Sequence, residues 1–346
     1  MRRYYIKTAG IIAVLTSAVL SGCNVLGRIP WAESMPIERT PAVVQEEPEH
    51  EPVVAIVPPE PAREEITLFV ESANYRLSLH EPPAGLYLGA YILSNPAIDF
   101  CITRFEAATG KPHAIYSYYT SAGETVPAAW LLECMARHKI PNIIVSSELN
   151  ASDDMLEQTA RAIGEFRMPM FIHPVPVERR FDPDQYRLFF RRAAEIFREH
   201  APEAAIVWTV KAEDAFDSMR FYPGDGYADW AGISLRRSIT EDRDYDSAMM
   251  GAFEHFYYSF QRSKPIMLTE FAVSHRSGID MAYRIPLAVD EISRVYGEFP
   301  REFPRLKAIV YTDINMTRSN HMTRDNFALL EQPEILSAYS GAVAAR

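Results

Sequence analysis

Short apolar runs recur along the chain, each five to eight residues long and rich in β-branched and aromatic residues, which is typical of buried strands. The runs are GLYLGAYI (85–92), HAIYSYY (113–119), PNIIVSS (141–147), PMFIHPV (169–175), AIVWTV (205–210), WAGIS (230–234), PIMLTEF (265–271) and KAIVYTDI (307–314). Stretches with helical period lie between them, and they include AIDFCITRFEAATG, VPAAWLLECMARHK, DDMLEQTARAIGEF, DPDQYRLFFRRAAEIFREH and MAYRIPLAVDEISRVYGEF. Strand and helix are therefore expected to alternate.

This alternation predicts the fold. Near-continuous apolar strands separated by crossover helices indicate a parallel sheet that helices cover on the outside. Eight such units in roughly 250 residues predict a single closed (β/α)8 TIM barrel, an α/β fold, over residues 66–346. A doubly wound open sheet is the alternative, but GAYILSNP at the first strand lacks the GxGxxG spacing of a dinucleotide site.

The N-terminus has the pattern of an export signal. A basic start, MRRYYIK, precedes an apolar stretch over 9–20 that is too short to span a membrane stably. The following Ser-Gly-Cys triplet resembles a bacterial lipoprotein signal, which implies cleavage after residue 22 and a lipid on Cys23. A signal anchor or a plain secretory peptide is the alternative. We expect signal peptide 1–22 and an exported, membrane-anchored lipoprotein that faces the periplasm or the cell exterior.

Residues 23–65 are expected to be a disordered linker. The stretch 36–65 holds seven prolines, eight glutamates and two basic side chains, too little apolar surface to order itself. Its charge of 2 − 8 = −6 supplies more than half of the chain's −11. The domain beyond it is only mildly acidic and leaves no basic patch for nucleic acid. We expect a monomer.

Other common chemistries have little support in the sequence. Cys101 and Cys134 fall within helical patterns, where a buried apolar role is expected, although a disulfide between them is conceivable in an exported protein. The nine histidines are scattered and no His/Asp/Glu cluster has metal-ligand spacing, so no metal and no cofactor are expected. No GxSxG elbow is present.

Candidate catalytic residues come from the ends of the predicted strands, because a barrel gathers its chemistry at the C-terminal ends of its strands. An ionised carboxylate there can attack the anomeric carbon of a sugar if a second carboxyl group, about 5 to 5.5 Å away, protonates the leaving oxygen; this geometry retains the configuration. Aromatic side chains near the strand ends could stack on sugar rings, although most are expected to pack. The strand-end candidates are Glu148, His173, Glu178, Ser234, Glu270, Asp313 and Asn315.

Several phrases resemble glycoside hydrolase family 26, the β-mannanase family. KPIMLTEF resembles the family's seventh strand, whose glutamate is the nucleophile, and this implies that role for Glu270. FYPGDGYADWAGIS (221–234) resembles the approach to the sixth strand, FEAATGKPHAIYSYY (105–119) the first helix and second strand, and DPDQYRLFFRRAAEIFRE (182–199) the fourth helix. The resemblance spans about Leu86 to Tyr339 and implies a retaining β-mannanase.

The sequence departs from the family at two strand ends. The family's fourth strand ends in Arg-Pro-x-His-Glu-Met-Asn, whose glutamate is the acid/base; here HPVPVER places His173 at the arginine and Val177 at the acid. After the sixth strand, Gly-hydrophobic-Asp-x-Tyr becomes Gly-Ile-Ser-Leu-Arg, which ends at Arg236. The glutamate of the third strand persists as Glu148.

Two readings of Glu270 follow. In the first, Glu178 takes over as acid/base, which requires the backbone after Pro176 to turn its side chain inward. In the second, Glu178 pairs with a neighbouring arginine, and Arg236 neutralises Glu270 and occupies the substrate's place. We assign catalysis to Glu270 and Glu178, and substrate binding to His173, Glu148, Tyr227 and Arg236.

These readings give two hypotheses. One is a lipid-anchored retaining glycoside hydrolase that acts on a β-linked polysaccharide, β-mannan by resemblance. The other is a degenerate barrel that binds carbohydrate or serves as a scaffold without hydrolysis.

Overall fold

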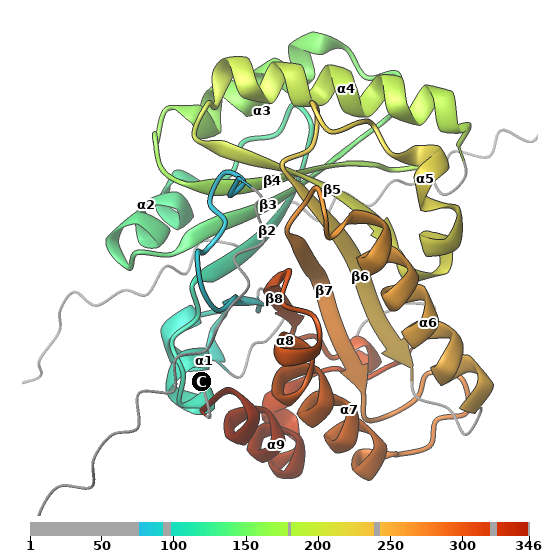
Figure 1. Cartoon of the computed structure of the whole chain (residues 1–346). Coiled ribbons are helices and arrows are strands. Elements are labelled where there is room, and N and C mark those ends of the chain that lie inside the picture. The colour runs from blue at the N-terminus through green and yellow to red at the C-terminus, as the bar shows by residue number, and fades with distance from the viewer. Residues whose placement is uncertain (1–75, 93–97, 179–180, 239–242, 319–323, 345–346) are drawn as a thin grey trace, which may run out of the picture. The chain divides into compact units, whose positions relative to one another are not determined.

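The computed structural model describes residues 76–92, 98–178, 181–238, 243–318 and 324–344 (Figure 1). The expected signal peptide, the linker, the lipidation site Cys23 and the expected first residues of the domain, 66–75, lie outside the described residues.

Eight parallel strands close into a barrel in sequence order, with β1 hydrogen-bonded to β8, and this confirms the predicted TIM barrel. The strands are β1 (Tyr87–Tyr91), β2 (Ile115–Ser121), β3 (Ile140–Ser147), β4 (Met170–Pro176), β5 (Ala204–Lys211), β6 (Trp230–Ser238), β7 (Ile266–Ser274) and β8 (Leu306–Thr312). The helices are α1 (Ile102–Thr109), α2 (Ala128–Ala136), α3 (Asp153–Gly164), α4 (Pro183–His200), α5 (Ser218–Phe221), α6 (Arg243–Phe260), α7 (Ile285–Gly297), α8 (Phe299–Glu302) and α9 (Pro333–Ala344). Each predicted run contributes one strand.

Helix α4 illustrates how the sequence sets the helical layer. Asp182 caps its N-terminus by accepting hydrogen bonds from the backbone N–H groups of Asp184 (2.9 Å) and Gln185 (3.2 Å), and Pro183 occupies the first turn. The buried face of α4 is apolar and mostly aromatic.

Among the residues that the structure describes, no helix is both long and apolar enough to cross a membrane.

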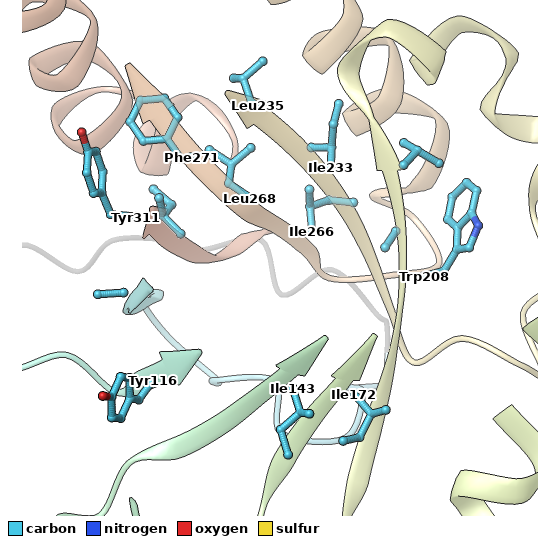
Figure 2. Packing of buried hydrophobic residues seen from close by; sticks show 14 of the residues in the cluster. Tyr116, Ile143, Ile172, Trp208, Ile233, Leu235, Ile266, Leu268, Phe271 and Tyr311 are labelled. Carbon is cyan, nitrogen blue, oxygen red and sulfur yellow. The ribbon is translucent and has the colours of Figure 1, made fainter. Parts of the chain in front are cut away.

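Side chains pack in two layers on either side of the barrel wall. The inner layer fills the barrel near the N-terminal ends of the strands and consists of Ile115, Phe171, Ala205, Val207, Trp230, Met267, Ala308 and Val310. The outer layer lies between strands and helices, and Figure 2 shows part of it, including Ile143, Trp208, Ile233, Leu268 and Phe271. Because the inner layer closes the base of the barrel, the remaining internal space opens toward the C-terminal ends of the strands.

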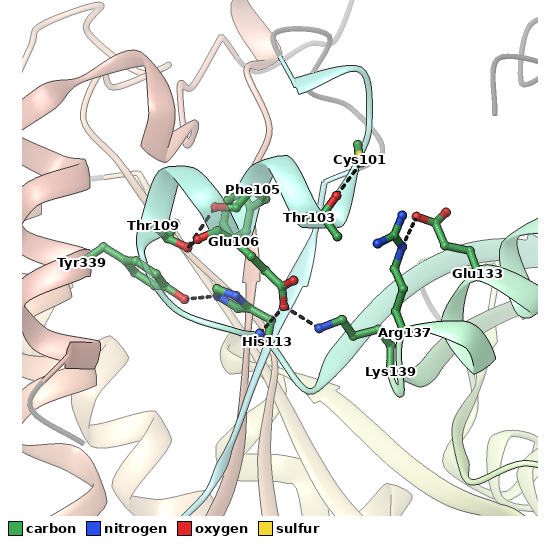
Figure 3. Close-up of polar contacts among 10 residues, drawn as sticks. All are labelled: Cys101, Thr103, Phe105, Glu106, Thr109, His113, Glu133, Arg137, Lys139 and Tyr339. Atoms are coloured by element: carbon green, nitrogen blue, oxygen red, sulfur yellow. Dashed lines mark hydrogen bonds and ion pairs between the residues drawn. The ribbon is translucent and has the colours of Figure 1, made fainter. Parts of the chain in front are cut away.

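A polar network joins α1, the start of β2 and α9 at the base of the barrel (Figure 3). The imidazole Nε2 of buried His113 lies 2.6 Å from the hydroxyl of Tyr339. Glu106 accepts hydrogen bonds from the backbone N–H of His113 and from the Lys139 ammonium, both at 2.5 Å. Burial lowers the pKa of His113 to about 4, so its ring is neutral at pH 7. We refer to these four residues as the base network.

Both cysteines of the barrel are buried and no disulfide joins them, in agreement with the expected apolar role. Burial raises the pKa of Cys134 to about 12, which makes it unreactive at neutral pH.

Candidate active site

A cavity of about 410 Å³ lies at the C-terminal ends of strands β2 to β7. Its wall combines apolar side chains from β3 to β5 with several polar groups, as ligand pockets commonly do. The polar lining residues are Tyr119, His173, Glu178, Tyr186, Thr209, Lys211, Asp214, Ser234, Thr269 and Glu270.

A β-bulge in β7 turns Glu270 into this cavity. On the β6 side, Ile233 pairs with Leu268 but the next residue, Ser234, pairs with Glu270, so β7 contains one extra residue, Thr269. On the β8 side the pairing also shifts between Leu268 and Phe271. The extra residue breaks the alternation of the strand: Thr269 and Glu270 both line the cavity, whereas Leu268 and Phe271 pack in the outer layer.

Three side chains, one from β2 and two from β6, hold the Glu270 carboxylate. The hydroxyl of Tyr119, from β2, donates a hydrogen bond to Oε1. The hydroxyl of Ser234, from β6, donates to Oε2 over 2.6 Å. The Nε of Arg236 lies 3.7 Å from the same Oε2, and its side chain is 43% exposed. The carboxylate therefore has a fixed orientation at the cavity wall, with a solvated cation on one side.

Tyr119 is a site residue that sequence reasoning placed among the aromatic residues expected mostly to pack. Its ring makes an edge contact with Tyr91, with centroids 4.8 Å apart. Desolvation and the charge of Glu270 raise the pKa of Tyr119 well above its usual value, so its hydroxyl remains a donor at neutral pH. The alternation of side chains along β2 could have identified Tyr119. Ile115 points into the barrel, and Tyr119, four residues later on the same face of the strand, is therefore predicted to point inward as well.

Glu178 reaches the cavity from just beyond the end of β4. Val177, at the position that the family resemblance gives to the acid, is 54% exposed, and its backbone N–H donates to the Ser147 carbonyl over 2.9 Å. The Oε1 of Glu178 accepts a hydrogen bond from the Leu149 N–H over 3.1 Å. Its Oε2 is buried and has no hydrogen-bond partner among the described residues. Because the strand ends at Pro176, its alternation no longer fixes the direction of the Glu178 side chain.

His173 forms part of a polar layer at the cavity floor. Its Nε2 lies 2.6 Å from the Asn142 Oδ1 and its Nδ1 lies 3.0 Å from the Thr209 Oγ1. Burial lowers the pKa of His173 to about 3, so a neutral ring occupies the place of the family's arginine. Gly232 makes room for this layer, because a Cβ there would lie 2.9 Å from the Thr209 Oγ1 and 2.4 Å from the Thr269 Cγ2.

Lys211 and Asp214 were not predicted as site residues. Lys211 ends β5 and Asp214 lies in the 3-10 helix η2 (Ala212–Asp217) that follows it. Desolvation, reinforced by the charge of Glu213, raises the pKa of Asp214. Their position in the sequence could have identified them, because both residues follow the fifth apolar run, at the C-terminal end of a strand, where a barrel gathers its chemistry.

The structure does not bring all predicted residues into the cavity. Glu148 is exposed and Tyr227 lies beneath the guanidinium of Arg191, 5.0 Å from its ring centroid, and neither lines the cavity. Asp313 is fully buried and accepts a hydrogen bond from the Leu329 N–H over 2.7 Å. The Nδ2 of Asn315 donates to Glu331 over 2.6 Å. These last two residues hold the loop after β8. Within the described ranges, no group of three His, Cys, Asp or Glu side chains could hold a metal ion.

The barrel is similar to solved glycoside hydrolases. A double mutant of the Cellulomonas fimi endo-beta-1,4-mannanase matches with a TM-score of 0.57 and 14% identity, over 75% of this chain and 70% of that one. A GH26 beta-mannanase from Bacteroides ovatus matches with a TM-score of 0.52 and 13% identity, over 76% and 89%. Beta-glucuronidase 2 from Bacteroides uniformis matches at 0.52 and 11%, over 77% of this chain but only 37% of that one. No family model and no curated protein sequence matches.

At these identities the likeness establishes a shared fold. The resemblance to family 26 mannanases, expected from the sequence motifs, is confirmed at this level. The chemistry of this chain depends on its own residues.

Proposed function

We propose that this protein is a retaining glycoside hydrolase that cleaves a β-linked polysaccharide, with Glu270 as the nucleophile and Glu178 as the acid/base. The observation that carries the proposal is the presence of these two carboxyl groups in the wall of one cavity at the C-terminal end of a closed barrel. A retaining mechanism needs such a pair.

In the first step, a Glu270 oxygen attacks the anomeric carbon as the bond from that carbon to the leaving oxygen breaks. Glu178, protonated, gives its proton to the leaving oxygen, and a glycosyl ester forms on Glu270. In the second step, Glu178 takes a proton from water, the water oxygen attacks the same carbon, and Glu270 leaves as a carboxylate. Two inversions give retention.

The environment of each carboxyl group supports its assigned role. Glu270 accepts two hydrogen bonds, from Tyr119 and Ser234, and lies near Arg236, contacts that hold its carboxyl group in one orientation at the cavity wall. In Glu178, the buried Oε2 has no hydrogen-bond partner among the described residues, so this oxygen is available to the leaving group of a substrate.

The substrate that we propose is a β-1,4-mannan, cleaved by an endo-1,4-β-mannosidase-like reaction. This rests on the likeness to mannanases together with the sequence motifs of β7, of the approach to β6, of α1 with β2, and of α4. We further propose that the lipoprotein signal at Cys23 anchors the barrel to a membrane, facing the periplasm or the cell exterior.

A second candidate function is carbohydrate binding without hydrolysis. The observation that favours it is the solvent-directed Val177 at the family's acid position, with Arg236 beside Glu270. A barrel that lacks an effective proton donor would lose a factor of about 10² to 10⁴ on unactivated glycosides while still binding them.

Hydrolysis of two substrates by the purified full chain separates the candidates. One is 4-nitrophenyl β-mannoside, whose leaving group needs little acid assistance, and the other is β-1,4-mannohexaose. A retaining hydrolase cleaves both and releases the β-anomer first, which NMR detects before mutarotation. A binding protein releases nothing from either substrate, although mannohexaose still binds. If mannohexaose is neither cleaved nor bound, both candidates are wrong.

A further inference from the structure

A second hollow runs along the outside of α4 and meets the candidate active site. It has a volume of about 990 Å³ and shares Glu178 and Phe181 with the wall of the first cavity. The two hollows therefore adjoin at these two side chains, beside the mouth of the barrel.

Two arginines of α4 fix the two sides of this hollow. The guanidinium of Arg192 donates to the carbonyl oxygens of Leu149 (3.3 Å) and Ala151 (2.8 Å), which holds the loop after β3. On the other side, the Nε of Arg191 donates to the Pro223 carbonyl over 2.8 Å, and its guanidinium covers one face of Tyr227. Both walls are thus tied to one helix, and the hollow is formed before any ligand arrives.

The lining of this hollow includes one well-exposed apolar side chain. Of the exposed side chains along α4, a helix described from end to end, only Leu188 is apolar, and it is 67% exposed. Gln185 and Asn150, which carry side-chain amides, belong to the same lining. The lining on α4 runs from Gln185 to Glu195, about 15 Å at 1.5 Å per residue.

The chemistry of this lining fits a neutral polymer rich in hydroxyl groups. Two acids, Glu178 and Glu195, balance two arginines, so no net charge selects an ionic ligand. An exposed aliphatic surface can receive the C–H face of a sugar ring, while side-chain amides can bond its hydroxyl groups.

We infer that this groove, defined by Asn150, Glu178, Phe181, Gln185, Leu188 and Tyr227, binds a further stretch of the polysaccharide that the Glu270 cavity takes. The inference rests on the proposed function. In this inference the polysaccharide leaves the cavity past Phe181 and continues along α4, so the binding site extends beyond the mouth of the barrel.

Calorimetric titration of the full chain tests this inference, with Glu270→Gln introduced to prevent hydrolysis. The two probes are β-1,4-mannohexaose, long enough to leave the cavity, and β-1,4-mannobiose. The groove variants are Leu188→Ser and the double variant Asn150→Ala, Gln185→Ala. The matched control is Leu132→Ser, because Leu132 is an exposed leucine (55%) on α2.

The groove variants should weaken mannohexaose binding roughly tenfold and leave mannobiose binding unchanged, whereas Leu132→Ser should change neither. Unchanged mannohexaose affinity in both groove variants would overturn the inference, as would equal losses for both sugars or no binding at all. The turnover of 4-nitrophenyl β-mannoside by the chain with intact Glu270 separates the two proposals. If the aryl mannoside is turned over but the groove variants bind mannohexaose as tightly as the parent chain, only the inference about the groove is wrong. If turnover and mannohexaose binding are both absent, the proposed function is wrong too.

Discussion

The two ends of the barrel use similar polar residues in opposite ways. At the base, Glu106 accepts two hydrogen bonds from within the fold, and His113 is bonded to Tyr339. At the mouth, Glu270 is also hydrogen-bonded but faces a cavity, and Glu178 keeps one buried oxygen without a described partner. Polar groups that are satisfied inside the fold stabilise it, whereas groups left facing a cavity are available to a ligand.

This contrast predicts that changes at the mouth reduce activity and leave stability nearly intact, and that changes in the base network do the reverse. The following tests are ordered by the size of the expected effect.

The largest effect is expected for Glu270→Gln. Hydrolysis of 4-nitrophenyl β-mannoside should fall by roughly 10³-fold or more, because an amide cannot form the covalent intermediate. The free energy of unfolding in urea should change by less than about 1 kcal/mol. The matched control is Glu133→Gln, which breaks the surface ion pair of α2 with Arg137 and should affect neither quantity. Full activity in Glu270→Gln would remove the nucleophile from the proposal.

Glu178→Gln should show a loss that depends on the leaving group. Cleavage of mannohexaose should fall by about 10² to 10⁴, and cleavage of 4-nitrophenyl β-mannoside much less, because only the poor leaving group needs a proton during the first step. The comparable change at the neighbouring strand end, Glu148→Gln, provides the control, since Glu148 is exposed outside the cavity. Equal losses on the two substrates would point to a structural role for Glu178.

At the base, His113→Ala should lower the free energy of unfolding by about 2 to 4 kcal/mol. The substitution leaves a cavity and removes the hydrogen bond between the His113 ring and the buried Tyr339 hydroxyl. Turnover per folded molecule should stay within about twofold of wild type. A large loss of turnover in the folded fraction would contradict the separation between base and mouth.

The pattern of apolar residues predicted the barrel, its eight strands and the place of Glu270, because strand and helix periods and the strand-end rule depend on local sequence. It did not predict the contact of Tyr119 with Glu270, which joins residues 151 positions apart in the chain. The resemblance assigned Tyr227 to substrate binding, but no local pattern indicated that its ring lies outside the Glu270 cavity, against Arg191 in the groove along α4. The β7 bulge was not predicted either, because it depends on how β7 pairs with both neighbouring strands, β6 and β8.

The pH dependence of stability sharpens the comparison, because each region holds a buried neutral histidine. His113 has a pKa of about 4 and His173 about 3, both below the ordinary value of 6.5 in the unfolded chain. Between these values and 6.5 the unfolded chain binds more protons, so stability falls as the pH is lowered through this window. Each histidine should lower the free energy of unfolding by about 2 kcal/mol when the pH is lowered from 7 to 5.

Urea unfolding at the two pH values measures this dependence. His113→Gln and His173→Gln should each reduce the difference between pH 7 and pH 5 by about 2 kcal/mol relative to wild type. An undiminished difference in either variant would mean that the histidine in question is not held neutral.

The smallest effect is expected for Tyr119→Phe, which removes one donor from the Glu270 carboxylate. We expect kcat to fall about tenfold with little change in KM, since a single hydrogen bond to a charged group contributes about 1.5 to 3 kcal/mol at most. Tyr91→Phe, which keeps the ring packed against Tyr119, is the control. A stability loss without any change in kcat would assign Tyr119 to packing.

Trapping of the glycosyl ester tests the central claim most directly. The chain is incubated with 2-deoxy-2-fluoro-β-mannosyl fluoride, whose fluorine at C2 slows breakdown of the ester, and then examined by intact-mass and peptide mass spectrometry. We predict the addition of one fluorosugar, located on Glu270 in the peptide that contains KPIMLTEF, and no addition to Glu270→Gln. A label on another residue, or an active wild-type chain whose Glu270 is never labelled, would contradict the account.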